Sequence, residues 1–126
     1  MTTPDKSAIR NAATVIALRD RRTDPHVLMG QRGATAAFMP NKFVFPGGAV
    51  DAADASVPLA RPLPGLCAQR LTEDCTLDLT HALAAAAIRE LWEETGLMLG
   101  RPGVWPAQPP QDWAGFAERG LLPSAE

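Results

Sequence analysis

The chain has 126 residues, which suffice for one domain of ordinary size and are too few for two. Hydrophobic residues make up 46% of the sequence and charged residues 21%, proportions that exclude a long coiled coil and a chain that is disordered throughout. The formal net charge is −2 and the Arg and Lys residues are scattered, so we expect no nucleic-acid polymer as a partner.

Neither a targeting segment nor a cysteine motif is legible. The longest apolar run, residues 82–88, is far shorter than the ~20 residues that cross a bilayer, and residues 1–6 do not begin a secretory signal. We therefore expect a cytoplasmic protein without a membrane partner. The spacing of Cys67 and Cys75 matches neither a zinc knuckle nor a redox motif, which favours two free thiols, with a zinc site that includes His81 as the open alternative.

The first third of the chain is typical of short strands. Two apolar runs, at 12–19 and 27–32, flank residues 20–25, which are rich in Asp, Arg and Pro, and this arrangement predicts a hairpin. Residues 42–45 predict a third strand. The Pro-Gly-Gly sequence at 46–48 predicts a tight turn after it, because glycine allows backbone conformations that a side chain forbids.

An irregular insertion and a long helix are expected next. Periodicity fades at about 55–79, where prolines interrupt the sequence. The helix is predicted to run from an N-cap at Thr80 to a C-terminal glycine at Gly96.

The end of the chain predicts little regular structure. Residues 97–99 could start a strand, and the Pro-rich segment at about 100–112 indicates a loop. A short helix that includes Trp113 and Phe116 is expected to stop at Gly120.

The long helix is predicted to have an acidic side. Glu90, Glu93 and Glu94 are neighbours on one face, so their like charges destabilise the isolated helix. They also lie near the C-terminal end, where the helix dipole disfavours anions, and only Arg89 is close enough in sequence to offset them. A solvated acidic face is one interpretation. A bound Mg²⁺ is the other, because a hard cation takes carboxylate ligands and supplies the missing positive charge. The remaining positions include an apolar packing side with Ala84, Ala87, Ile88, Leu91 and Thr95.

A wider pattern surrounds this helix. Residues 89–97, RELWEETGL, are similar to the second half of the Nudix box, R-E-U-x-E-E-x-G-U with U an aliphatic residue. The first half, a glycine followed six residues later by an acid, has its counterpart in residues 45–54, FPGGAVDAAD, with Asp54 where the family prefers Glu. The two halves are split, because 34 residues separate Asp54 from Arg89. On these residues the chain resembles the Nudix hydrolase family.

One branch of the family is especially similar. Residues 38–48, FMPNKFVFPGG, the acids within 51–54, the insertion and the helix resemble the RP2-like, or nucleoside diphosphate-linked moiety X motif 19-like, branch. Studied members of that branch include acyl-CoA diphosphatases, so the resemblance implies coenzyme A or an acyl-CoA as substrate. Residues 28–32 are placed like part of the signature of coenzyme A-cleaving members, but Ala37 and Asn41 depart from that signature.

The resemblance implies an α/β fold with a mixed β-sheet sandwiched between helices. Only 29 residues follow Leu97, and a Nudix domain normally has more strands and a further helix at that point. Residues 1–126 are therefore expected to be the N-terminal portion of a single Nudix domain, incomplete at its C-terminus. Such a portion would have unpaired strand edges, which predicts weak stability or completion by another chain, such as a homodimer. We also expect these residues alone to have little hydrolytic activity.

The resemblance also implies a chemistry. Nudix enzymes use metal ions to hydrolyse a diphosphate that links a nucleoside to another moiety. Carried over by position, Glu90, Glu93 and Glu94 would be catalytic carboxylates that bind Mg²⁺ or Mn²⁺, and one of them would be the general base. The Gly47 carbonyl would be a further metal ligand, and Arg89 would be a catalytic residue that orients the carboxylates or Asp54.

Substrate contacts are less defined. Arg32 and Gly48 are candidate substrate-binding residues, and Arg32 is otherwise a solvated charge at a strand end. Two other classes of function stay open. The chain could be a noncatalytic Nudix-like module that binds a nucleotide or a protein, or a structural fragment with an acidic helix that does not respond to divalent ions.

Overall fold

The computed structural model describes residues 10–35 and 40–126. Three residues used above for the family resemblance lie outside the described ranges: Ala37, Phe38 and Met39. The first half of the described chain forms short strands and one 3₁₀ helix: β1 (Ala12–Thr14), β2 (Leu18–Arg19), β3 (His26–Val27), β4 (Gly30–Gln31), β5 (Phe43–Val44), β6 (Gly47–Ala49) and η1 (Ala52–Ser56).

The strands pair in a pattern that the sequence predicts only in part. The expected hairpin is confirmed, because β2 pairs with β3 in antiparallel register. The two flanking runs are each divided, however, so that β1 pairs with β6 and β4 with β5. The expected turn at Gly47 and Gly48 is wrong: both residues lie in β6, opposite Thr14 and Ala13. In the part of the chain that is described, every ladder has two strands and is antiparallel.

The long helix α2 (Leu77–Thr95) begins earlier than expected. Its N-cap is Thr76, whose hydroxyl accepts a hydrogen bond from the Leu79 N–H at 3.2 Å, so the prediction of Thr80 is wrong. Thr80 is instead buried inside the helix and donates its hydroxyl to the Thr76 carbonyl at 3.0 Å. The predicted end is confirmed, because Gly96 adopts a left-handed conformation with φ of 78°.

The insertion is not irregular throughout, contrary to the sequence prediction, because it contains a helix. Helix α1 (Gly65–Thr72) occupies its centre, with Pro64 as the N-cap. Pro58, Pro62 and Pro64 all precede the first helical residue, where proline does not interrupt helical hydrogen bonding. No residue of α1 is buried, so the helix packs only loosely on the rest of the chain.

The C-terminal segment is also more regular than a loop. It contains β7 (Gly100–Pro102), η2 (Gln111–Trp113), α3 (Ala114–Glu118) and β8 (Leu121–Pro123), and β7 pairs with β8. The Pro-rich segment therefore begins as a strand, three residues after the position where one was expected to start, and ends in a 3₁₀ helix. Gly120 ends the short helix as predicted, with φ of 66°.

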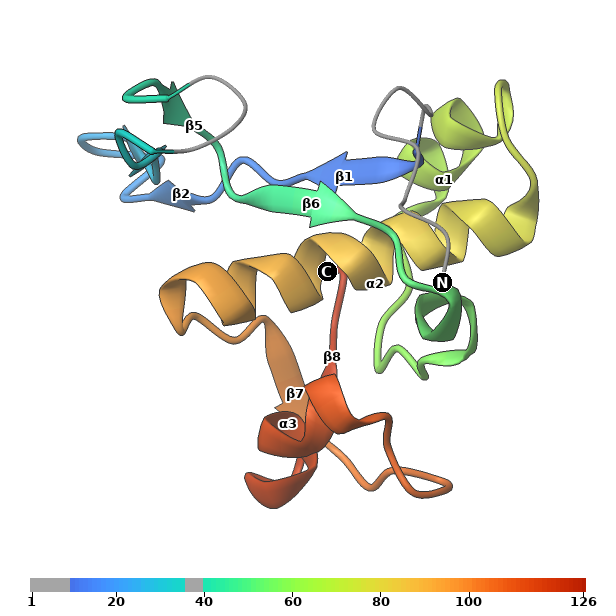
Figure 1. Cartoon of the computed structure of the whole chain (residues 1–126). Coiled ribbons are helices and arrows are strands. Elements are labelled where there is room, and N and C mark those ends of the chain that lie inside the picture. Colours follow the sequence, from blue (N-terminus) through green and yellow to red (C-terminus); the bar gives the residue numbers. More distant parts are fainter. Residues whose placement is uncertain (1–9, 36–39) are drawn as a thin grey trace, which may run out of the picture.

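Helix α2 lies at the centre of the structure. The β1–β6 ladder lies along one side of it, and β7, β8 and α3 lie on the other side (Figure 1). Trp113 and Phe116 are fully buried and pack with Ala85 and Ile88 of α2. Because both sides of α2 are covered, its burial is wider than the predicted single packing side. The core cluster comprises Val57, Ala85, Ile88, Trp113 and Phe116.

Neither α2 nor any other helix in the described ranges combines the length and the apolar character needed to cross a membrane.

Candidate functional site

The last turns of α2 lie against β6. The Gly47 N–H donates a hydrogen bond to a carboxylate oxygen of Glu94 at 3.3 Å. A Cβ atom on Gly48 would lie 2.5 Å from the Glu90 carboxylate, and a Cβ on Gly47 would overlap the backbone carbonyl of Ala13. The two glycines are therefore required for close approach, since any side chain here would displace the carboxylates or the neighbouring strand.

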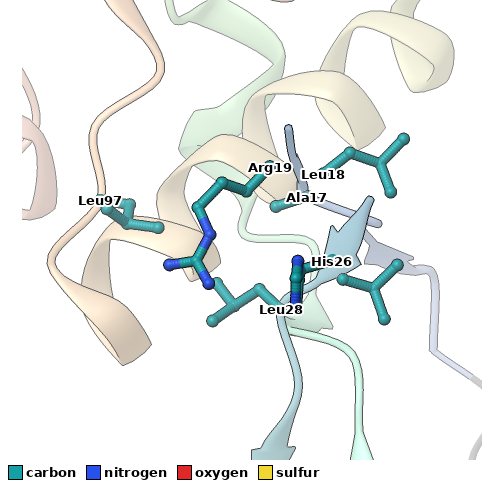
Figure 2. A pocket seen from close by; sticks show the side chains of 7 residues that line it. Ala17, Leu18, Arg19, His26, Leu28 and Leu97 are labelled. Carbon is teal, nitrogen blue, oxygen red and sulfur yellow. The ribbon is translucent and has the colours of Figure 1, made fainter. Parts of the chain in front are cut away.

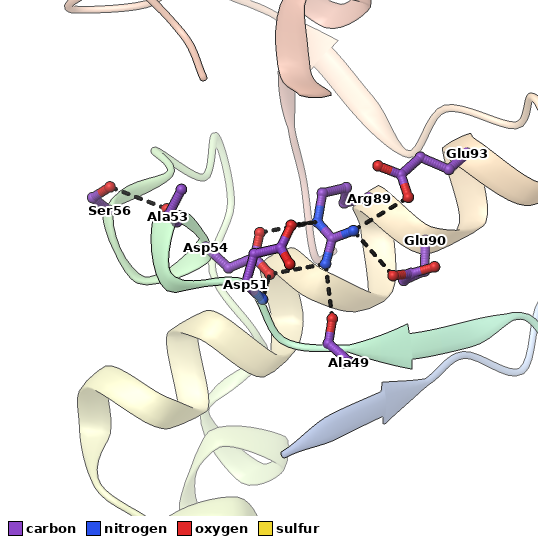
Figure 3. Close-up of polar contacts among 8 residues, drawn as sticks. All are labelled: Ala49, Asp51, Ala53, Asp54, Ser56, Arg89, Glu90 and Glu93. Atoms are coloured by element: carbon purple, nitrogen blue, oxygen red, sulfur yellow. Dashed lines mark hydrogen bonds and ion pairs between the residues drawn. The ribbon is translucent and has the colours of Figure 1, made fainter. Parts of the chain in front are cut away.

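Arg89 is the centre of the polar contacts in this site (Figure 3). Its guanidinium donates to both carboxylate oxygens of Asp54, from Nε and Nη2, at 3.1 Å each. Nη2 also donates to the Ala49 carbonyl at 2.9 Å. Nη1 donates to Glu90 at 3.0 Å and to Glu93 at 3.2 Å. One side chain thus joins two predicted metal-site carboxylates to η1 and β6.

Asp54 closes the split box in space. Its side chain is fully buried and also accepts the Asp51 N–H at 2.8 Å. The Asp51 carboxylate lies 3.5 Å from the Arg89 Nε, so two acids of η1 and its N-cap face the same guanidinium. The 34 residues between Asp54 and Arg89 therefore do not separate the two halves of the motif.

Burial and charge perturb two of these groups. Burial alone would lower the pKa of Arg89, but the hydrogen bond and the charge of Asp54, with help from Asp51 and Glu90, raise that pKa above its usual value. Partial burial raises the pKa of Glu93. The negative charges of Glu90 and Asp112 act in the same direction, against the opposing effect of Arg89. A cation bound near Glu93 would oppose this shift, because a positive charge favours the ionised carboxylate.

The oxygen atoms available at this site are suitable ligands for a hard cation. Glu90, Glu93, Glu94 and the Gly47 carbonyl offer only oxygen ligands, the kind that Mg²⁺ and Mn²⁺ take. The carboxylates do not converge as they stand: within residues 10–35 and 40–126, no three His, Cys, Asp or Glu side chains are grouped so that they could hold one ion. Glu90 and Glu93 point to Arg89 and Glu94 to the Gly47 N–H, so side-chain rotation would be needed to bring them onto one ion.

The alternative zinc site is not formed. Among the residues that the structure describes, Cys67, Cys75 and His81 are not grouped so that they could hold an ion. A nitrogen of the His81 ring lies 2.6 Å from the Val57 carbonyl, and Cys75 contacts Thr80 instead. Both cysteines are free thiols, as expected.

The remaining candidates occupy different places. Gly48 lies directly beside Glu90, whereas Arg32 follows β4, where its backbone pairs with Lys42 and Asn41. Sequence reasoning missed Asp51 and the Ala49 carbonyl as partners of Arg89. The position of Asp51, three residues before Asp54 in the same short helical turn, was the available signal, whereas nothing in a sequence identifies a particular backbone carbonyl as an acceptor.

Two known proteins are similar in sequence to most of this chain. No family model matches the chain. Over 97 aligned residues it is 37% identical to a Caenorhabditis elegans protein named nudix hydrolase 7, covering 77% of this chain and 25% of that protein. It is 34% identical to a chicken (Gallus gallus) protein named acyl-coenzyme A diphosphatase NUDT19, covering 82% of this chain and 33% of that protein.

A solved structure shares the fold. The crystal structure of a NUDIX hydrolase from Alicyclobacillus acidocaldarius matches with a TM-score of 0.65 and 30% sequence identity, covering 96% of this chain and 59% of that one. The chain spans a quarter to a third of the length of the two curated relatives. Together, the split motif that Arg89 joins, the similar sequences and the shared fold show that the chain belongs to the Nudix family and has the α/β Nudix fold.

Proposed function

We propose that this chain forms the cation-binding centre of a hydrolase that cleaves the diphosphate linkage of a nucleoside diphosphate joined to another moiety. The proposed substrate class is coenzyme A or an acyl-CoA. The name of the chicken relative supports that class, and the residues of the Nudix box support the reaction.

The observation that carries the proposal is the position of Arg89. A guanidinium that is 4% exposed holds Glu90 and Glu93 on one side and Asp54 on the other. A helix whose acidic face served only for solvation would not need a buried cation that fixes two of its carboxylates. The arrangement keeps these carboxylates close to one another and to β6, from where rotation of their side chains would bring them to a charged ligand.

The resident ion would be Mg²⁺ or Mn²⁺, held by Glu90, Glu93, Glu94 and the Gly47 carbonyl. When bound, such an ion neutralises the diphosphate and lowers the pKa of a water molecule. The chain's own groups then have separate tasks. Arg89 positions the carboxylates through its hydrogen bonds, and the glycines of β6 let Glu90 and β1 approach closely. One glutamate accepts the proton of the attacking water.

The test is hydrolysis of coenzyme A, an acyl-CoA ester and a nucleotide sugar, each with Mg²⁺, with Mn²⁺ or with a chelator. Because we expect slow turnover by this chain, the protein is used in excess over substrate. We expect cation-dependent cleavage at the diphosphate, and a loss of about 100-fold or more in Glu93→Gln and Glu94→Gln. Glu73→Gln, an exposed site just after α1, is the matched control and should cleave normally.

Two outcomes would contradict the proposal. Equal cleavage by all variants would remove the assignment of the glutamates. Cation binding without any cleavage of the three substrates would favour the noncatalytic nucleotide-binding or protein-interaction module instead.

A further inference from the structure

A cavity of about 300 Å³ lies beside the end of α2. Residues 17–19 and 26–28, from the β2–β3 hairpin, line one part of it, and Leu97 lines the other (Figure 2). This volume is at the lower end of the range for small-molecule sites, about 300–1,000 Å³. The cavity is separate from the carboxylates of the Nudix box, and none of its lining residues has a part in the proposed hydrolysis.

The walls of the cavity are apolar and accessible. Leu18 is 56% exposed, Val27 48% and Leu97 49%. The large apolar side chains of the core, such as Trp113 and Phe116, are in contrast fully buried. Leu18 and Val27 are direct partners across the β2–β3 ladder, so they form one continuous surface. Apolar side chains that gather around a hollow in this way are typical of a ligand-binding surface.

Two nitrogen-bearing side chains complete the cavity. Arg19 and His26 are also paired across the β2–β3 ladder, and the Arg19 side chain extends between Leu97 and Leu28 (Figure 2). Arg19 lies 3.7 Å from Asp20 in an ion pair whose members are largely exposed, so solvent weakens that pair and the guanidinium can turn to another anion. The His26 Nδ1 donates to the Asp24 carbonyl at 2.7 Å, because that carbonyl can only accept.

The cavity is close to the carboxylates along two paths of the chain. Thr14 pairs with Gly47, and Ala17 follows three residues later, which in an extended chain is about 10 Å. On the other side, Leu97 follows Glu94 by three residues. A ligand whose diphosphate lay at the carboxylates could therefore place its neighbouring group in the cavity.

We propose that this cavity binds the nucleoside end of the substrate, and specifically a nucleoside that carries a phosphate outside the diphosphate linkage. The base would lie against Leu18, Val27 and Leu97, and the additional phosphate would face Arg19. A simple acyl chain would use the apolar wall but would offer no anion to the guanidinium, whose existing pair with Asp20 is exposed and weak. The proposed occupant is therefore the phosphorylated end, which can use both the apolar wall and Arg19. The inference rests on the proposed function for the position of the diphosphate, but binding at the cavity can be measured without hydrolysis.

The experiment is calorimetric titration of the chain with adenosine 3′,5′-bisphosphate in the absence of divalent cations. We expect binding that weakens about five- to tenfold in Arg19→Gln, since one charge-assisted contact is lost at an accessible site. Leu97→Asp should weaken binding as well, by placing a negative charge on the wall. Arg70→Gln, at an exposed residue of α1 outside the cavity, is the matched control and should bind like the unmodified chain. Adenosine and inorganic phosphate, titrated separately, should each bind more weakly than the bisphosphate.

Several results would overturn the inference. These are absence of bisphosphate binding, equal binding by all variants, or binding of inorganic phosphate as tight as that of the bisphosphate. A shift in sedimentation with Leu97→Asp, without bisphosphate binding, would show that the cavity is covered by a second copy of the chain. Failure of the proposed function is distinguishable, because the bisphosphate would then still bind in an Arg19-dependent way while no substrate was cleaved. If Arg19→Gln cleaved coenzyme A with an unchanged KM, the proposed function would stand, but the assignment of the cavity to the nucleoside end would be contradicted.

Discussion

Arg89 illustrates how a single residue can organise a site. Its guanidinium is almost fully buried, and three hydrogen bonds to Asp54 and the Ala49 carbonyl satisfy one side of it. Removing one member of a buried ion pair leaves the other charge without compensation, which costs far more than the pair itself contributes. The fixed guanidinium in turn determines where Glu90 and Glu93 lie.

Replacement of Arg89 should therefore destabilise the whole chain. We expect Arg89→Ala to lower the free energy of unfolding by about 3–5 kcal/mol, because Asp54 is left buried and unpaired. Urea unfolding followed by circular dichroism measures this difference. Arg70→Ala, at an exposed site on α1, should change stability by less than about 0.5 kcal/mol. Equal stability of the two variants would show that the buried network does not support the fold.

Glu93 predicts a dependence of stability on pH. Partial burial, supported by the charges of Glu90 and Asp112, raises its pKa in the folded chain, so the folded state holds this proton more tightly than the unfolded state. The resulting stabilisation is present at acid pH and is lost as the pH rises through the raised pKa. We expect Glu93→Gln to gain stability relative to the unmodified chain between acid and neutral pH.

That comparison is made by urea unfolding at several pH values without divalent cations. Glu118→Gln, on the exposed surface of α3, controls for the loss of one negative charge. A Glu93→Gln variant that becomes less stable than the unmodified chain toward neutral pH would contradict the direction of the shift.

The residues of the site divide clearly into those a sequence can predict and those it cannot. The motif predicts the spacing of the glutamates and Arg89. It also predicts Asp54 as one of the partners of Arg89. Asp51 and the Ala49 carbonyl became visible only in three dimensions, because their proximity depends on how η1 follows β6.

At the level of elements, β6 is where fold and site meet. Its glycines are placed for two different reasons: Gly47 packs closely on the backbone of β1, whereas Gly48 faces the Glu90 carboxylate. Backbone atoms cannot move aside without breaking a ladder, but the end of a flexible side chain can. The same substitution should therefore have different consequences at the two positions.

We expect Gly47→Ala to reduce the free energy of unfolding by about 1–3 kcal/mol, because its methyl group would overlap the backbone of Ala13 and Thr14. Gly48→Ala should cost less than about 1 kcal/mol but should weaken Mn²⁺ binding about tenfold or more, since Glu90 must rotate away. Thermal unfolding and calorimetry separate the two effects. If Gly48→Ala bound Mn²⁺ normally, the Glu90 position would not matter for the cation.

Element boundaries were predictable where one residue type decides them. Gly96 and Gly120 end their helices because only glycine adopts the left-handed conformation at little cost. The start of α2 was ambiguous because Thr76 and Thr80 are both suitable caps. Strands of two or three residues are too short to show an alternation, so their pairing could not be derived from pattern alone.

At the scale of the molecule, α2 joins two layers. The β1–β6 ladder covers one side of α2 and the C-terminal segment the other (Figure 1). Arg89 and Glu90 contact β6, whereas Ile88 packs with Trp113 and Phe116. This arrangement explains why a long insertion is compatible with an intact motif. The segment with α1 leaves the site after Asp54 and returns at the start of α2, so its length does not alter the contact between Asp54 and Arg89.

The central claim is that the carboxylates of α2, which Arg89 and β6 keep close together, bind a divalent cation. Calorimetric titration of the chelator-treated chain with Mn²⁺ tests it most directly, beside Glu90→Gln, Glu94→Gln and the control Glu118→Gln. Binding by the unmodified chain and the control, weakened about tenfold or more in the first two variants, is the predicted result. Absence of Mn²⁺ binding, or equal binding by all four proteins, would contradict the account and leave the acidic face as a solvated surface.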